Sequence, residues 1–181
     1  MNDPNKKKTG NASSRKRPAL LLARLAILLA AAMILSYVEH LIPAFVAIPG
    51  VKIGLANTVT VFALYLLGAP YAIGLSLGRV LLSSLLFGNA AALLYSLAGA
   101  AVSFLGMFLL RRIGRFSPFG VSVAGGVLHN LGQILAACLL FENGGLLSLL
   151  PPLILSGTIA GVLIGVLAGI LIRRLEGLFV K

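Results

Sequence analysis

Six polar or charged residues interrupt long apolar stretches of the chain, and their side chains are of types that could bind a ligand. They are Lys52, Asn57, Arg79, His129, Asn130 and Gln133. A lysine, an arginine and a protonatable histidine that converge on one pocket favour an anionic or strongly polar ligand. Arg79 stands about nine residues into an apolar segment, where a guanidinium needs carbonyls, a carboxylate or a ligand anion as a partner.

Two interpretations of Arg79 stay open. It could bind the ligand, or it could be structural and paired with Glu39 or with the carbonyls of a helix end. His129 and Gln133 are one helical turn apart and therefore share a face, with Asn130 beside them. Several glycines thin the helix around these residues, and a polar, glycine-rich segment at membrane depth is typical of a lined cavity. We therefore expect a binding pocket here, and we count Glu39 as a seventh residue that binds the ligand, beside the six named above.

The stretch 49–60 (PGVKIGLANTVT) carries the other two polar positions. Lys52 lies at the start of an apolar run, where a lysine can also snorkel to the membrane surface. Asn57 is deeper and has no such escape. We expect Asn57, Arg79 and His129 to form the centre of the pocket, with residues 49–52 as its rim or lid.

The composition decides the environment. Of 181 residues, 59% are hydrophobic and 10% are charged, whereas about a quarter of the residues in a soluble domain are charged. The chain must therefore use lipid as its solvent, as a multi-pass protein of the cytoplasmic membrane. The net charge of +11 comes from basic residues at the N-terminal tail and at helix ends, so contacts with anionic lipids are expected and nucleic acid is not.

The apolar segments predict an all-α fold with six transmembrane helices, each near the 20 residues that a span needs. They cover residues 18–38, 51–67, a third segment ending at 87, then 90–110, 119–141 and 153–172. Residues 1–17 are polar and basic and are predicted to be a disordered cytoplasmic tail, leaving 18–181 as the membrane domain. Lysine and arginine lie mainly in the tail, in the 111–115 loop and near the C-terminus, which predicts that both termini are cytoplasmic.

Small residues mark two helix faces. Four glycines in the last helix are each four residues apart, at Gly157, Gly161, Gly165 and Gly169, and predict close helix packing. The first helix has a small-residue strip at Ala19, Ala23, Ala26 and Ala30. That strip fits packing within the chain or docking of a second membrane protein, and both interpretations stay open.

Catalysis is poorly supported by the sequence. No segment has a close pair of acids, a nucleophile elbow or a phosphate-binding loop. Prenyl diphosphate chemistry needs Mg²⁺ held by clustered aspartates, and the one aspartate is Asp3. Two histidines and one cysteine, Cys138, offer no metal site. We expect neither catalytic residues nor a cofactor.

Two motifs resemble the Gx transporter family, many of whose members are named heptaprenyl diphosphate synthase component I. They are PGVKIGLAN at 49–57 and SVAGGVLHNLGQ at 122–133, within a likeness that covers residues 20–172. That family resembles the substrate-binding S components of energy-coupling factor (ECF) transporters. The resemblance implies six helices, a pocket that opens outward, and a face on the first helix, matched by Ala26 and Ala30, that docks a transmembrane coupling subunit.

The resemblance implies that the chain captures a small molecule for an uptake transporter that partner ATPase subunits energise. The alternative is a membrane component of heptaprenyl or polyprenyl diphosphate synthesis.

Overall fold

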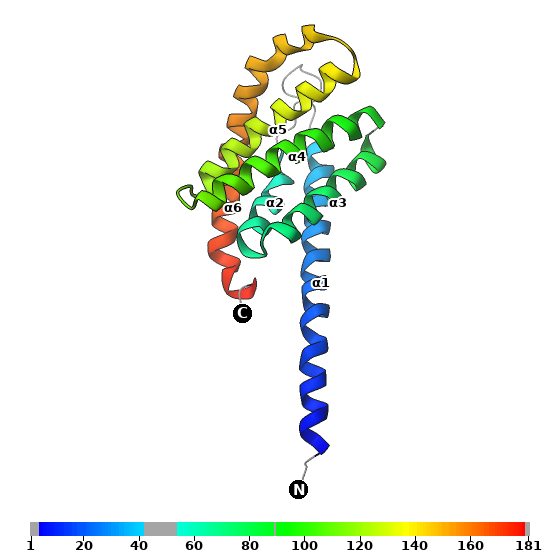
Figure 1. Cartoon of the computed structure of the whole chain (residues 1–181), viewed down its shortest axis with the longest axis vertical. Coiled ribbons are helices and arrows are strands. Elements are labelled where there is room, and N and C mark those ends of the chain that lie inside the picture. The colour runs from blue at the N-terminus through cyan, green and yellow to red at the C-terminus, as the bar shows by residue number, and fades with distance from the viewer. Residues whose placement is uncertain (1–3, 42–53, 89, 180–181) are drawn as a thin grey trace.

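The structure of the protein is a computed structural model that describes the backbone of residues 4–41, 54–88 and 90–179, and side chains from Pro18 onward. The described residues form six α-helices and one short 3₁₀ helix, which confirms the all-α prediction (Figure 1). The elements are α1 (Pro4–Leu41), α2 (Asn57–Leu66), α3 (Ala69–Phe87), α4 (Ala90–Ile113), α5 (Pro118–Leu140), η1 (Gly144–Leu149) and α6 (Leu150–Phe179).

Five helical segments among the described residues are long and apolar enough to cross a membrane. They are 18–41 of α1, the whole of α3, α4 and α5, and the continuous segment 144–179 formed by η1 and α6. Their outward side chains are large and apolar: Leu85 of α3 is 76% exposed and Leu139 of α5 is 81% exposed. Side chains of this kind are stable on a lipid-facing surface, so the protein is a multi-pass membrane protein. The sidedness of the termini stays a prediction.

The predicted second span is shorter than expected. The sequence pattern predicts a helix over 51–67, but α2 begins at Asn57 and has ten residues, and residues 51–53 lie outside the described part. Ten residues rise about 15 Å, half of the roughly 30 Å of hydrocarbon. Gly54 explains the late start, because its φ of 75° places it in the left-handed region, outside the helical range. Five helical segments of the described structure therefore have spanning length, and α2 is shorter than the predicted second transmembrane helix.

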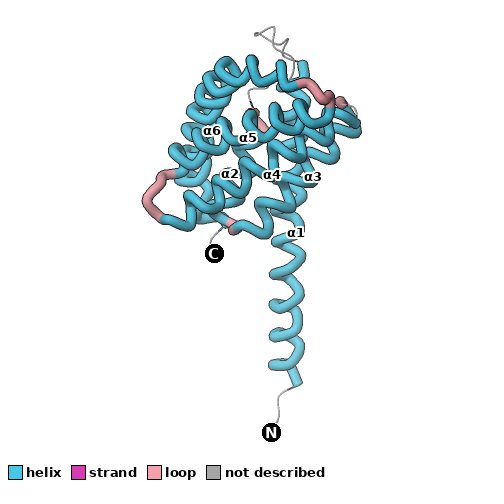
Figure 2. The backbone as a smooth tube through the Cα atoms, turned by 45° about the horizontal axis from the view of Figure 1, so that its top comes forward, coloured by secondary structure: helices cyan, strands magenta, loops and turns pink. Residues whose placement is uncertain are grey.

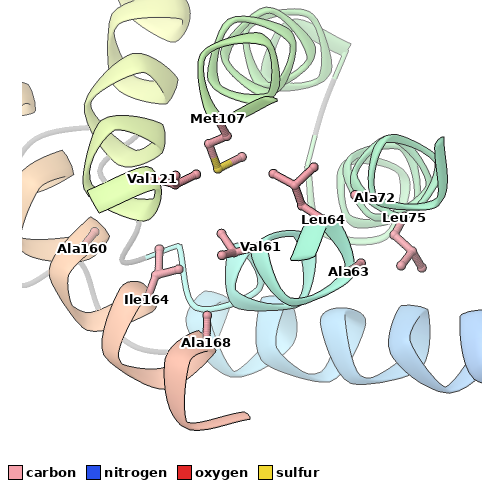
Figure 3. Packing of buried hydrophobic residues seen from close by; sticks show 10 residues of the cluster. All are labelled: Val61, Ala63, Leu64, Ala72, Leu75, Met107, Val121, Ala160, Ile164 and Ala168. Carbon is pink, nitrogen blue, oxygen red and sulfur yellow. The ribbon is translucent and has the colours of Figure 1, made fainter. Parts of the chain in front are cut away.

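This short helix lies at the centre of the bundle. Every residue from Thr58 to Leu64 is buried, and α2 packs against α3, α6 and α1. In Figure 3, Val61 faces Ile164 of α6, and Ala63 faces Ala72 of α3. The most buried helix is thus the one that could least cross the membrane alone.

Around α2, helix α5 packs between α4 and α6. Ser117 caps α5 by accepting a hydrogen bond from the Gly120 N–H at 3.4 Å, and Pro118 follows at the first helical position, where no donor is lost. Helix α1 packs along α3 and continues out of the bundle toward the N-terminus (Figures 1 and 2). Because α1 begins at Pro4, it includes most of residues 1–17, and their separation as a disordered tail stays a prediction.

One end of the bundle carries most of the described arginines. There Arg111 of α4 donates to the Tyr65 carbonyl at 3.2 Å, and Arg24 of α1 donates to the Leu178 carbonyl at 2.5 Å. The α4–α5 connection and the C-terminal end of α6 therefore lie at this basic end, close to the C-terminal end of α2. The other end holds Glu39 and the start of α2 at Asn57.

Candidate functional site

A polar cavity of about 80 Å³ lies inside the bundle, toward the end opposite the arginines. All six helices or their flanking residues contribute to its wall. The polar side chains that line it are those of Glu39, Asn57, Arg79, Ser83, Ser84, Ser96, His129, Asn130 and Gln133. The structure thus brings together six of the seven residues predicted to bind a ligand. The seventh, Lys52, and the predicted rim at 49–52 lie outside the described residues.

Arg79 contributes the positive charge in the described wall. It is half-buried on α3, and its Nε is buried without a hydrogen-bond partner among the described residues. The Glu39 carboxylate at the end of α1 acts on it electrostatically. The Glu39 carboxylate therefore balances the charge of Arg79 without using all of its hydrogen-bond donors. The remaining donor is of a type that binds anions.

Glu39 also fixes the start of α2. Its Oε1 accepts a hydrogen bond from the Gly54 N–H, which ties the end of α1 to the turn before Asn57. Gly54 also lies close to α6, because a Cβ at this position would approach Ile164 Cδ1 at 3.3 Å. Glu39 therefore has two roles, as the countercharge of Arg79 and as an anchor of the cavity wall. Its predicted structural pairing with Arg79 is compatible with a binding role for Arg79.

The first N–H groups of α2 are not available to a ligand. Those of Asn57, Thr58 and Val59 donate to the carbonyls of Gly54, Leu55 and Ala56, at 2.8, 3.1 and 3.3 Å. A helix N-terminus often binds anions through such groups. Here they are already used, so recognition must come from side chains such as Asn57 and Arg79.

His129 and Gln133 are positioned by the close approach of α4 to α5. A Cβ on Gly99 of α4 would lie 2.6 Å from Gln133 Cγ and 2.8 Å from the His129 carbonyl oxygen. Only a glycine leaves this space, so Gly99 fixes the depth at which both side chains enter the cavity. The sequence analysis did not select Gly99 as a site residue.

Asn130 holds α5 to α6. Its Nδ2 donates to the Leu153 carbonyl at 2.6 Å and to Ser156 Oγ at 3.2 Å, and the residue is only 7% exposed. This part of its amide is already committed to the protein. Asn130 therefore shapes the wall between two helices more than it offers donors to a ligand.

The sequence analysis also missed Ser84 and Ser96, which line the cavity from α3 and α4. Ser84 is nearly buried and Ser96 is half-buried. Small polar residues of this kind occur equally in helix packing, so their type alone did not distinguish a lining residue from a packing residue.

The predicted small-residue faces differ in their surroundings. A Cβ on Gly157, Gly161 or Gly165 would approach α5 backbone atoms at 2.7, 2.6 and 2.9 Å, so these three lie directly against α5. Gly169 differs, since a Cβ there would meet nothing within 4 Å among the described residues, and its packing role stays a prediction. On α1 the four alanines of the predicted docking strip are all exposed: Ala19, Ala23, Ala26 and Ala30.

The described wall of the cavity carries side chains that can bind a polar or anionic ligand. It offers one guanidinium, one carboxylate, one imidazole, amides and hydroxyls. No group of three or more histidine, cysteine, aspartate or glutamate side chains occurs among the described residues, so that part of the chain shows no clustered metal ligands. The volume is below the 300–1,000 Å³ that is usual for pockets that enclose a whole drug-sized ligand. It suits a small anion or the polar head of a larger molecule.

Comparison with known proteins shows the family. The model of the heptaprenyl diphosphate synthase component I family matches residues 28–171, which is most of the chain. The protein therefore belongs to the heptaprenyl diphosphate synthase component I family. No curated protein and no solved structure matches it, so the likeness to ECF S components stays a prediction.

Proposed function

We propose that this protein is a non-catalytic membrane subunit that binds a small anionic group in the polar cavity. The observation that carries the proposal is the buried Nε of Arg79, which lacks a hydrogen-bond partner in the described structure and belongs to a cavity-lining side chain. A buried guanidinium donor is costly when unpaired. An anion supplied by a ligand would satisfy it, with His129 and Gln133 on the opposite wall.

The family match favours one biological setting, that of a membrane component in heptaprenyl or polyprenyl diphosphate synthesis. The chain would hold the diphosphate or another anionic group, and a partner subunit would supply the Mg²⁺-binding acids and the catalysis. The residues support this division of labour, because the described part of the cavity wall contains a single carboxylate, that of Glu39.

A second candidate is the substrate-binding subunit of an uptake transporter, energised by partner ATPases. The exposed alanine strip of α1 favours it, because small residues on a lipid-facing helix let another helix approach closely. In this setting the same cavity would capture an anionic or polar nutrient, and α1 would contact the coupling subunit.

The binding step is tested with the purified protein in lipid nanodiscs. We expect inorganic diphosphate or phosphate to raise the melting temperature, and Arg79→Gln to abolish the increase. Arg112→Gln is the matched control, since Arg112 is exposed and its loss changes the net charge equally. If Arg79→Gln responds to both anions as the wild type does, the cavity is not the anion site.

The two settings are separated by assays in cells. The synthesis role predicts that membranes lacking this chain form less polyprenyl diphosphate, and that Arg79→Gln does not restore it. The transport role predicts ATP-dependent accumulation of a labelled solute that requires the chain. Unchanged polyprenyl yield after deletion would exclude the first setting.

A further inference from the structure

A second cavity, of about 510 Å³, adjoins the polar one and has a different character. It is lined by α4, α5, η1 and α6, and most of its wall is apolar. The lining side chains include Tyr95, Ile134, Ala137, Phe141, Leu149 and Leu153. Its volume is within the range of pockets that enclose a complete small molecule.

Gln133 lines both cavities. Its stem lies against Gly99, which places its amide at the boundary between the polar wall and the apolar wall. A second link is the hydrogen bond from Asn130, which lines the polar cavity, to the carbonyl of Leu153, which lines the apolar one. The two spaces are therefore neighbours that share Gln133 in their walls.

We propose that the two cavities form one site for an amphiphilic anion. Its phosphate or carboxylate head would lie by Arg79 and His129, and its apolar chain would pass Gln133 into the larger cavity. This inference rests on the proposed function for the anionic head of the ligand, and it adds a binding place for the apolar chain of the ligand. The small polar volume holds a head alone, while Ile134 and Leu153, each 6% exposed, offer a dry wall for the chain.

The test uses methyl, butyl and octyl phosphate with the protein in phosphatidylcholine nanodiscs, and measures affinity by calorimetry. Burial of each methylene strengthens binding by up to about fourfold, so we expect octyl phosphate to bind at least about a hundredfold more tightly than methyl phosphate. Empty nanodiscs correct for partitioning into lipid. Equal affinity for the two phosphates would overturn the inference and leave the anion site intact.

Two variants test whether the alkyl chain of octyl phosphate lies in the apolar cavity. Ala137→Trp fills the apolar cavity from α5, and Leu149→Trp fills it from η1, so a folding defect in one does not decide the result. We expect each to weaken octyl phosphate binding at least tenfold and to change methyl phosphate binding less than twofold. Leu139→Trp is the control on α5, because Leu139 is 81% exposed. If both cavity variants bind octyl phosphate as tightly as the wild type does, its alkyl chain lies outside the apolar cavity.

Arg79→Gln separates this inference from the proposed function. We expect it to weaken methyl and octyl phosphate by similar factors. If it leaves octyl phosphate unaffected, the head is not in the polar cavity and the single-site inference fails. If the wild type binds neither phosphate, the proposed function fails as well. Weaker octyl phosphate binding in nanodiscs with phosphatidylglycerol would agree with the site and identify a membrane lipid as the source of the ligand, whereas unchanged binding would indicate a free amphiphile.

Discussion

Gly126 of α5 and Gly157 of α6 meet backbone to backbone in the wall of the polar cavity. A Cβ on Gly157 would lie 2.7 Å from the Gly126 carbonyl oxygen and 2.9 Å from Asn130 Nδ2. Real Cβ atoms essentially never come so close to backbone atoms. The width of the cavity between α5 and α6 therefore depends on the absence of two side chains.

Gly157→Ala should destabilise the protein, because the added methyl must push α6 away from α5 and from the Asn130 amide. Overpacking of this kind costs about 1–3 kcal/mol. The melting temperature in detergent should fall and ligand binding should weaken. Gly169→Ala, on the same helix but with nothing within 4 Å, should be neutral or stabilising by up to about 1 kcal/mol. Equal melting temperatures for the two variants would contradict the close contact.

Gly99→Ala should damage the site more than the fold. Its methyl would displace Gln133 and the backbone at His129, and we expect anion affinity to fall about tenfold, or about 1.4 kcal/mol. Calorimetry with phosphate measures this loss. Gly74→Ala on α3 is the control, because its Cβ would meet nothing within 4 Å. A Gly99→Ala protein that binds as tightly as the Gly74→Ala protein would show that Gln133 and His129 do not contact the ligand.

Glu39→Gln should make stability dependent on anions. The neutral amide removes the countercharge of Arg79, and loss of one partner of a partly buried pair costs about 1–3 kcal/mol. Added phosphate should restore the melting temperature by replacing the carboxylate. Glu176→Gln, at an exposed position of α6, should change neither the melting temperature nor its response to phosphate. A Glu39→Gln protein that matches the wild type without phosphate would show that Glu39 does not balance Arg79.

Arg24→Ala should loosen the end of α6. Arg24 donates to the Leu178 and Phe179 carbonyls and its guanidinium carbon lies 5.2 Å from the centre of the Phe179 ring. The last carbonyls of a helix have no partner within the helix. Without Arg24 the end of α6 should therefore open more often, and its backbone amides should exchange faster. Hydrogen–deuterium exchange of residues 175–179 should rise about tenfold. Arg173→Ala, at an exposed position, should leave exchange in that segment unchanged.

The helices of the bundle could be predicted from local sequence, because each is an apolar run between glycine, proline or polar residues. The fifth segment was predicted to begin at 119 and α5 begins at Pro118, where Ser117 supplies the cap. The start of α2 could not be predicted. It depends on the left-handed conformation of Gly54 and on a hydrogen bond to Glu39, fifteen residues earlier in the chain.

Part of the candidate site could be predicted from local sequence, because polar residues stand out in apolar helices. Arg79 and His129 are conspicuous in an apolar chain, and both line the cavity. The role of Gly99 and the presence of the apolar cavity could not be predicted, because both depend on how α5 packs against its neighbours. Ala137 looks like any residue of an apolar helix until η1 is placed beside it.

The brevity of α2 bears on how the chain is made. A helix of ten residues that follows a non-helical turn would leave polar backbone groups exposed to lipid if it entered the bilayer by itself. Helix α3 begins three residues after α2 ends, so the two form a natural unit for insertion. We therefore expect α2 to enter the bilayer together with α3, and α2 can be fully enclosed only after α6, which comes after three further α-helices in the chain, has packed against it.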